Sequence, residues 1–227
     1  FIGLFKGLFF NYHAANLPDY RGPGDYGWEI LNNEKSVSVI IHQLIRRVDA
    51  GPILIKKTKK LIGNNIYPID FHNAIKKLAE DVWSNFLTLI KKSSYLILTP
   101  QDHHLAAYWP RLDSSVNGAI NLDWSKEDIR LFVNAFSEPF AGAFLFYRGK
   151  KIFIKEVKIS SRKKQPHPFM NGLIINKTND YLEVMVGGGS VLLQRIYDQG
   201  GDKILFNEFR VGDRFYMPSE VLERARQ

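Results

Sequence analysis

The chain has 227 residues, 45% of them hydrophobic and 24% charged, a balance typical of a globular protein with one large or two small domains. It contains no cysteine, which excludes disulfides, thiolate catalysis and cysteine-ligated zinc and fits a reducing cytoplasm, the location we predict. The formal net charge of +8 is compatible with a phosphorylated partner such as a nucleotide or tRNA, although excess lysine also promotes solubility.

Residues 1–10 are apolar apart from Lys6 and two glycines. They lack the basic n-region, the long apolar core and the cleavage site of a signal peptide. No stretch of the chain approaches the ~20 apolar residues of a membrane span, so we expect no membrane partner. We predict that residues 1–10 form a buried strand leading into Asn11, in a parallel sheet whose earlier strands precede it.

The segment after Asn11 predicts short elements joined by loops. A loop with Gly and Pro at 23–27 precedes a short helix at 28–31, and a second loop at 46–51 precedes an extended run at 52–57. Between them, residues 37–42 are continuous and β-branched, as is typical of a strand buried on both faces of a parallel sheet.

The clearest helix of the sequence follows Asp70, which we predict as its N-cap. One apolar stripe recurs at helical spacing after it, and its members are Phe71, Ala74, Ile75, Leu78, Val82, Phe86 and Ile90. We expect this stripe to pack against the core rather than to form a binding groove.

Residues 98–117 change in character and predict an extended linker. Within it, His103 and His104 have no third ligand at metal spacing, so we expect no metal site. Ser125 and Asp128 then resemble a capping box that opens a helix through Asn134.

Short strands alternate with turn signals over the rest of the chain, which predicts a small antiparallel barrel. The predicted strands are 143–147, 151–159, 172–177, 182–186 and 191–197. The glycine run 187–189 lacks a following Lys and Ser or Thr, so we predict a turn rather than a phosphate-binding loop.

Three polar residues close to apolar runs, Asn11, His13 and Asp49, have the chemistry that acyl transfer requires. An amide can stabilise an oxyanion, a neutral imidazole can accept a proton, and a carboxylate can orient that imidazole and raise its pKa. Because Asn11 and His13 are two residues apart on an extended segment, their side chains leave the same face. The chemistry alone leaves the division of roles between His13 and Asp49 open, and each residue taken singly is more often structural.

The sequence around these residues resembles a known family. Asn11 to Gly22 contains N-x-H followed by L-P-x-Y-R-G, and a D-x-G-P motif begins at Asp49, 36 positions after His13. This pattern is similar to that of formyltransferases that use N10-formyltetrahydrofolate. The resemblance implies that the chain is an α/β enzyme that transfers a formyl group to a primary amine.

The second half carries a resemblance of its own. The motifs I-N-L-D-W at 120–124, N-A-F at 134–136 and P-F-A-G-A at 139–143 resemble the C-terminal domain of methionyl-tRNA and sugar formyltransferases. The chain departs from the family pattern by two inserted residues in the first motif, by Asn134 in place of Arg and by Ala141 in place of Pro.

The resemblance implies a division of the chain into domains. Residues 1–97 would form the C-terminal half of a partial Rossmann-like catalytic domain, 98–117 a linker, and 118–227 a small OB-like antiparallel β-barrel. In the family the N-x-H motif lies in the middle of a domain. We therefore expect the chain to be a fragment that lacks the N-terminal part, roughly four strand–helix units, and much of the folate pocket.

The resemblance also implies the site residues. Asn11, His13 and Asp49 would be catalytic, and Arg47, Val48 and Asp49 would bind the co-substrate N10-formyltetrahydrofolate, with no metal. The substrate-binding residues would be Tyr20, Arg21, Trp28 and Arg111, with the two arginines pairing with diphosphate oxygens.

The acceptor amine is the least constrained part of this prediction. The stretch W-E-I-L-N-N-E at 28–34, His42 and the pair Tyr108 and Arg111 resemble the sugar enzymes, so we expect an amino-sugar nucleotide, and a homodimer is compatible with this assignment. The alternative is initiator methionyl-tRNA, which a basic run at 148–164 favours if that run is more than a solvated face.

A third hypothesis is a non-catalytic OB-type nucleic-acid-binding protein. It predicts aromatic side chains on the binding strands of the barrel. The available aromatic residues are Phe144, Phe146, Tyr147 and Phe153, which fit a core equally well.

Overall fold

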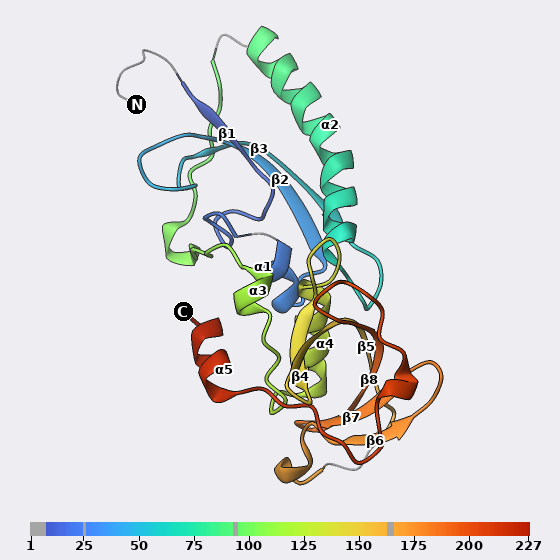
Figure 1. Ribbon diagram of the computed structural model, residues 1–227. Helices are drawn as coiled ribbons and strands as arrows, with labels where there is room; N and C mark the ends of the chain where they lie inside the picture. Colours follow the sequence, from blue (N-terminus) through green and yellow to red (C-terminus); the bar gives the residue numbers. More distant parts are fainter. Residues whose placement is uncertain (1–7, 25, 93–94, 163–165) are drawn as a thin grey trace. The chain divides into compact units, whose positions relative to one another are not determined.

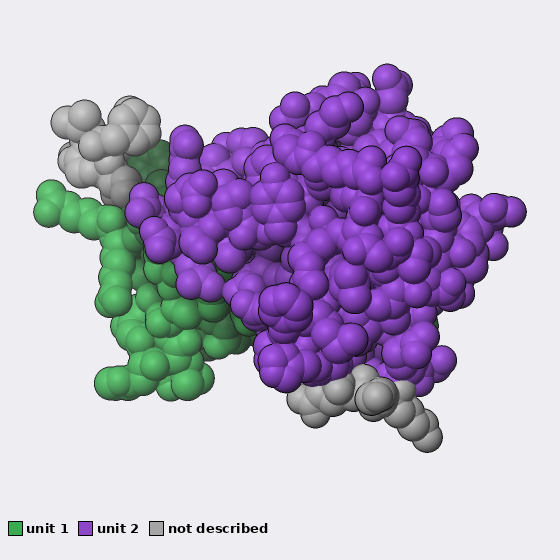
Figure 2. All heavy atoms as spheres, turned by 60° about the horizontal axis from the view of Figure 1, so that its bottom comes forward, with its two compact units in different colours: residues 1–112 green, residues 113–227 purple. Residues whose placement is uncertain are grey.

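The computed structural model describes residues 8–24, 26–92, 95–162 and 166–227 (Figure 1). Most of the predicted N-terminal strand, residues 1–7, lies outside the described residues. The chain divides into two compact units, Phe1–Leu112 and Asp113–Gln227, which Figure 2 shows in different colours. Each is a mixture of helices and strands built around an antiparallel sheet, so the protein belongs to the mixed α/β class.

The first unit contains a sheet of three strands, β1 (Phe10–His13), β2 (Ser36–Gln43) and β3 (Ile53–Lys60), in the order β1-β2-β3. The strand predicted at 37–42 is confirmed by β2, and those six residues are buried. The parallel arrangement is wrong for these strands, because both pairs are antiparallel. A parallel pair needs a crossover of roughly a dozen residues or more, and the connection 44–52 is shorter.

Helix α2 (Pro68–Lys92) packs on β2 and β3. Of the predicted stripe, Phe71, Ala74, Ile75 and Val82 are buried, whereas Ile90 is 45% exposed. The prediction of Asp70 as N-cap is wrong, because the helix begins two residues earlier, at a proline whose fixed φ suits the first helical position. The Asp70 carboxylate instead accepts a hydrogen bond of 2.9 Å from the backbone N–H of Tyr67.

Much of the predicted linker packs against the first unit. Thr99 and Ile53 exchange two backbone hydrogen bonds of 2.7 and 2.8 Å, and Arg21 bonds through its backbone to Ala107 and Trp109 at 2.9 and 2.8 Å. The 3₁₀ helix η2 (His103–Leu105) lies between these contacts. The segment thus forms part of one wall of the first unit, while the proposed domain boundaries remain a prediction.

The second unit begins with two helices, α3 (Ser114–Asn117) and α4 (Lys126–Ala135). The predicted cap of α4 is confirmed, since Ser125 Oγ accepts a hydrogen bond of 3.1 Å from the N–H of Asp128. The unit ends with η4 (Phe206–Glu208) and helix α5 (Ser219–Ala225), and η3 (Pro168–Met170) lies between two strands of its sheet.

The sheet of the second unit confirms the predicted strands to within three residues at each end. Its members are β4 (Ala143–Tyr147), β5 (Lys150–Ile159), β6 (Ile174–Lys177), β7 (Leu182–Val186) and β8 (Gly189–Tyr197), in the order β4-β5-β8-β7-β6. All neighbours are antiparallel, and the predicted glycine turn joins β7 to β8. A closed barrel is not observed, because β4 and β6 do not pair in the described part of the chain.

None of the helices in the described ranges is long and apolar enough to cross a membrane.

Candidate functional site

Strand β1 and the loop after β2 bring three polar side chains together in the first unit. Asn11 and His13 lie on β1, and Asp49 lies on the loop between β2 and β3. Asn11 Nδ2 donates a hydrogen bond of 3.3 Å to Asp49 Oδ1, and His13 Nδ1 lies 3.8 Å from Asp49 Oδ2. The structure thus brings together the amide, the imidazole and the carboxylate that the sequence predicts as catalytic.

The loop that carries Asp49 has a constrained backbone. Asp49 has φ +47°, in the left-handed region that Asp adopts more readily than most residues. Two residues later, Gly51 approaches β2 so closely that an added Cβ would lie 1.8 Å from the Gln43 carbonyl oxygen. A side chain at position 51 would therefore displace the loop and Asp49 with it.

The Asp49 carboxylate is held in its ionised form. The backbone N–H of Gly22 donates to Oδ2 at 2.8 Å, and His42 Nε2 lies 3.5 Å from Oδ1. Burial by itself raises the pKa of Asp49, but His42, the Gly22 N–H and His13 together lower that pKa below its ordinary value. Asp49 therefore carries a negative charge at neutral pH.

A backbone carbonyl orients His13. The His13 Nε2 atom lies 2.7 Å from the Tyr20 carbonyl oxygen, and because a carbonyl only accepts, Nε2 must carry the hydrogen. In the neutral ring, Nδ1 then holds the lone pair on the side of Asp49. The 3.8 Å separation from Asp49 Oδ2 is too long for a hydrogen bond, but it becomes an ion pair once Nδ1 takes up a proton.

The pKa of His13 lies below its ordinary value. Burial lowers it, the Tyr20 carbonyl and Asp49 raise it, and His42 lowers it again. The predicted upward influence of Asp49 on this pKa is present, but burial outweighs it and the net shift is downward. Neutral His13 is consequently the main form at pH 7, with Nδ1 available to accept a proton.

His42 is the buried neighbour that completes this group, and it is 1% exposed. The Nδ1 atom of His42 lies 3.0 Å from the backbone carbonyl oxygen of Gln43, so Nδ1 carries the hydrogen. The other ring nitrogen, Nε2, then accepts a hydrogen bond of 3.2 Å from Asn11 Nδ2. Both hydrogens of the Asn11 amide therefore have partners, His42 and Asp49. The sequence did not indicate that His42 contacts Asn11, because the two residues meet only through the antiparallel pairing of β1 with β2.

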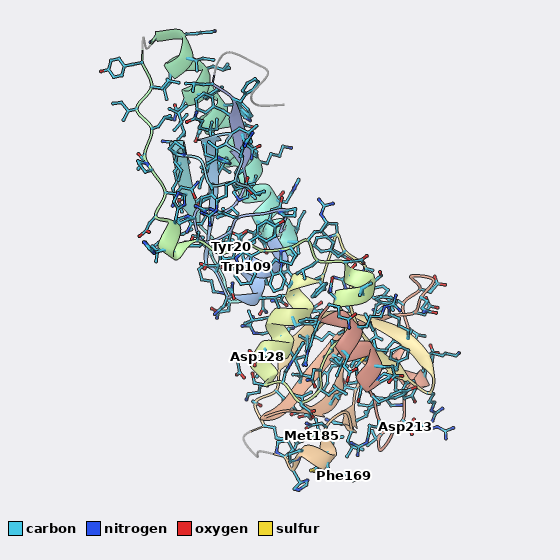
Figure 3. The ribbon with its side chains drawn as sticks, turned by 90° about the vertical axis from the view of Figure 1, so that its left-hand side faces the viewer. Tyr20, Trp109, Asp128, Phe169, Met185 and Asp213 are labelled. Atoms are coloured by element: carbon cyan, nitrogen blue, oxygen red, sulfur yellow. The ribbon has the colours of Figure 1, made fainter. Side chains whose placement is uncertain are left out.

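Two of the predicted substrate-binding residues, Tyr20 and Trp28, belong to an aromatic cluster. The rings of Tyr20 and Trp109 stack at 5.8 Å and lie side by side in Figure 3, and Trp28 lies 4.8 Å from Trp109. The Tyr20 hydroxyl donates to Glu34 at 3.0 Å, and the Trp28 indole N–H donates to the Pro110 carbonyl at 2.7 Å.

The two predicted substrate arginines differ in environment. Arg21 is 4% exposed, and its guanidinium donates to Gln101 and to His103 Nδ1. Arg111 is exposed and lies outside the residues that line the recess beside the aromatic cluster. Their contact with a diphosphate therefore remains a prediction.

A small recess with room for about one water molecule adjoins the aromatic cluster. It is lined by Ala15, Tyr20, Arg21, Gly22, Gly24, Trp28, Glu29 and Trp109. Glu29, on helix α1 (Tyr26–Leu31), is 2% exposed, and its Oε1 has no hydrogen-bond partner within the described ranges. Burial, together with the charge of Glu34, raises the pKa of Glu29 to about 8. Sequence reasoning missed this carboxyl, for which the one signal was an acidic residue inside a short, mostly apolar helix.

The predicted folate-binding residues Arg47 and Val48 are both exposed on the Asp49 loop, Val48 by 54%. Both residues therefore lie at the surface, adjacent in sequence to Asp49. Over the described part of the chain, no group of three or more His, Cys, Asp or Glu side chains is placed to hold a metal ion.

An ionised carboxylate, a neutral imidazole and a primary amide in one cluster have the chemistry of a general acid–base centre in a group-transfer enzyme. Residues 114–214 match the family described as formyl transferase, C-terminal domain. Over 204 residues, 90% of this chain, the sequence is 28% identical to a methionyl-tRNA formyltransferase from Acetivibrio thermocellus and covers 64% of it. The chain is thus similar to formyltransferases, and its second unit matches their C-terminal domain.

Solved structures share the fold. HypX from Aquifex aeolicus in complex with tetrahydrofolic acid aligns with a TM-score of 0.61 at 15% identity, over 88% of this chain and 34% of that one. An N-formyltransferase from Helicobacter canadensis, in complex with folinic acid and dTDP-3-aminofucose, aligns with a TM-score of 0.59 at 20% identity, over 82% of this chain and 65% of that one. The chain spans less than two thirds of each of these relatives.

Proposed function

We propose that the protein transfers a formyl group from N10-formyltetrahydrofolate to the primary amine of an amino-sugar nucleotide. The observation that carries the proposal is the cluster of Asn11, His13 and Asp49, in which a neutral imidazole with a free Nδ1 lies beside an ionised carboxylate. The similarity to formyltransferases, including the match of residues 114–214 to their C-terminal domain, supports the reaction type.

In the proposed reaction the amine nitrogen attacks the formyl carbon and forms the new C–N bond. The amine proton passes to His13 Nδ1, and the imidazolium that results is stabilised by Asp49. Collapse of the tetrahedral intermediate breaks the bond to folate N10, which takes the proton from His13 and leaves as tetrahydrofolate.

Asn11 is proposed to stabilise the oxyanion of that intermediate. Both of its amide hydrogens are bonded in this structure, to His42 Nε2 and to Asp49 Oδ1. The oxyanion would replace one of these two acceptors. Losing one such donor typically costs roughly 100- to 1000-fold in rate.

Arg47 and Val48 are proposed to contact the folate, because they are exposed beside Asp49. The second unit is proposed to correspond to the family's OB-like barrel. In support, Tyr216 forms a β-bridge with Phe146 of β4, and Arg214 forms one with Leu173, which directly precedes β6. One short segment therefore contacts both edges of the sheet. The cytoplasmic location and a homodimer stay predictions.

The acceptor is proposed to bind over the aromatic cluster of Tyr20, Trp28 and Trp109, beside the small recess that these residues line. Aromatic faces and a buried carboxyl suit the apolar ring and the polar groups of a nucleotide sugar. The structurally similar N-formyltransferase from Helicobacter canadensis was solved with dTDP-3-aminofucose, which fits this acceptor class.

Methionyl-tRNA is the second candidate acceptor, favoured by the 28% identity to a methionyl-tRNA formyltransferase. The basic run gives it less support than the sequence indicated, because several of its charges have partners. Arg148 pairs with Asp213 at 2.7 Å and Arg162 with Glu183 at 3.1 Å, whereas Lys163 and Lys164 lie outside the described residues. The aromatic residues of the third hypothesis are largely core, with Phe144 2% and Tyr147 8% exposed.

A donor–acceptor assay on the whole protein tests the proposal. N10-formyltetrahydrofolate labelled in the formyl group is supplied with a panel of amino-sugar nucleotides and, separately, with methionyl-tRNA. We expect label to appear on an amino-sugar nucleotide with a kcat/KM at least tenfold above that for methionyl-tRNA. The reverse order would assign the second acceptor, and transfer to neither would remove the proposed function.

A further inference from the structure

One buried amide connects the Asp49 loop to a buried arginine. Gln101 is 7% exposed, and its Nε2 donates to the carbonyl oxygens of Asp49 and Gly51 at 2.8 and 2.7 Å. Its Oε1 accepts from Arg21 Nε and Nη2 at 3.2 and 2.7 Å. Both hydrogens of this amide nitrogen and the amide oxygen are therefore engaged.

The two carbonyls that Gln101 binds lie on either side of Ala50, at the turn where Asp49 has its positive φ. A residue in that conformation persists only when its surroundings hold it. Gln101 supplies two of the hydrogen bonds that hold this turn, and both are accepted by backbone carbonyls. They fix where the loop lies and hence where the Asp49 carboxylate points.

Arg21 makes this contact strong. Arg21 is 4% exposed, and hydrogen bonds from a charged donor are shorter and roughly twice as strong as neutral ones. The bidentate contact polarises the amide of Gln101 and thereby strengthens donation by its Nε2. Arg21 also donates to His103 Nδ1 at 2.9 Å, which fixes the guanidinium plane.

We infer that Gln101 is a positioning residue: it transmits the fixed position of Arg21 to the Asp49 loop and so keeps the Asp49 carboxylate beside His13. This inference rests on the proposed function for its catalytic consequence. The geometrical part, the dependence of the Asp49–His13 contact on Gln101, stands independently of it.

The inference predicts a change that a merely structural residue would not cause. The charged and titratable groups that face His13 are Asp49, which raises its pKa, and His42, which lowers it. If the Asp49 loop loses its anchor, the carboxylate withdraws and the pKa of His13 falls further. In a plot of kcat against pH, the fall in kcat on the acidic side would then occur at lower pH, and the maximal kcat would also be lower.

Two substitutions separate this effect from loss of the fold. Gln101→Met keeps the volume but makes no hydrogen bond to the carbonyls, and Gln101→Asn keeps the amide on a shorter arm that cannot reach both of them. The matched control is Ser38→Ala, which removes a partly buried side-chain hydrogen bond of 2.9 Å to Thr58 in the same sheet.

Formyl transfer by the whole protein and the NMR titration of the His13 ring, identified by its loss in His13→Gln, are measured for each variant. Both Gln101 variants are expected to lower kcat about 100-fold with little change in KM and to lower the pKa of His13, and Ser38→Ala to do neither. Wild-type turnover with an unchanged His13 titration, or a loss of activity that only follows loss of folded protein, would overturn the inference. If the wild type transfers no formyl group, the proposed function fails, and the His13 titration alone still decides whether Gln101 holds Asp49.

Discussion

Two carboxyls of the first unit have pKa values displaced in opposite directions. Asp49 is surrounded by donors, so its pKa is lowered even though burial opposes this, whereas Glu29 has no donor to its Oε1 within the described ranges and its pKa is raised to about 8. The two carboxyls differ both in their partners and in depth, since Glu29 is buried and Asp49 is partly exposed. These differences leave the proposed catalytic carboxylate charged and the recess carboxyl mostly neutral at pH 7.

Glu29 should make the stability of the protein fall as pH rises. Its folded-state pKa of about 8 lies above the ordinary 4.5, so the folded state holds a proton that the unfolded state releases across this window. Glu29→Gln, which cannot ionise, should match the wild type near pH 4.5 and exceed it by on the order of 3 kcal/mol at pH 7.

Urea unfolding across this pH range measures the effect. Glu80→Gln is the matched control, because it removes the same charge from an exposed position on α2. A Glu29→Gln variant whose advantage does not grow with pH would show that Glu29 is ionised in the folded protein.

The sequence indicated the members of the polar cluster but not their contacts. Asn11, His13 and Asp49 could be predicted because their types and spacing match a known pattern. The contacts of three other residues could not be predicted, because each depends on parts of the chain that are distant in sequence. His42 meets Asn11 through an antiparallel register, and Gln101 reaches the Asp49 loop because residues 98–112 return over the unit. Glu29 is buried beside the aromatic cluster.

At the scale of elements, prediction succeeded where the signal is local. The strands of the second unit and helix α4 follow from alternation, turn residues and a cap, which neighbouring residues determine. The arrangement of the first sheet did not follow, because a continuous apolar strand such as β2 is compatible with parallel or antiparallel neighbours.

The cap of α4 gives a test at this scale. Ser125→Ala removes the acceptor for the Asp128 N–H and should lower the stability of the second unit by about 1 kcal/mol, whereas Ser125→Thr keeps an acceptor and should lose less. Trp124 packs 4.8 Å from Phe132 of α4, so its fluorescence reports unfolding of this unit. Equal stabilities of the Ala and Thr variants would contradict the capping role.

For the whole molecule, the net charge of +8 is a weaker guide to partners than it first appears. Lys151 donates to the Ser115 carbonyl at 3.1 Å and lies 3.5 Å from the centre of the Phe144 ring, so this cation helps to hold the second unit together. Arg195 likewise pairs with Glu138 at 2.6 Å. The net charge records neither which cations are engaged in this way nor where they lie, so it does not by itself indicate a phosphate-binding surface.

The central claim concerns the polar cluster of the first unit, and formyl transfer by single variants of the whole protein tests it most directly. His13→Ala removes the proposed proton acceptor and Asp49→Ala the group that stabilises its charged form. His72→Ala and Asp81→Ala, at exposed positions on α2, are the matched controls. With N10-formyltetrahydrofolate as donor, we predict a loss of at least about 100-fold in kcat for both site variants and wild-type rates for both controls. Near-wild-type turnover by His13→Ala or by Asp49→Ala would contradict the assignment.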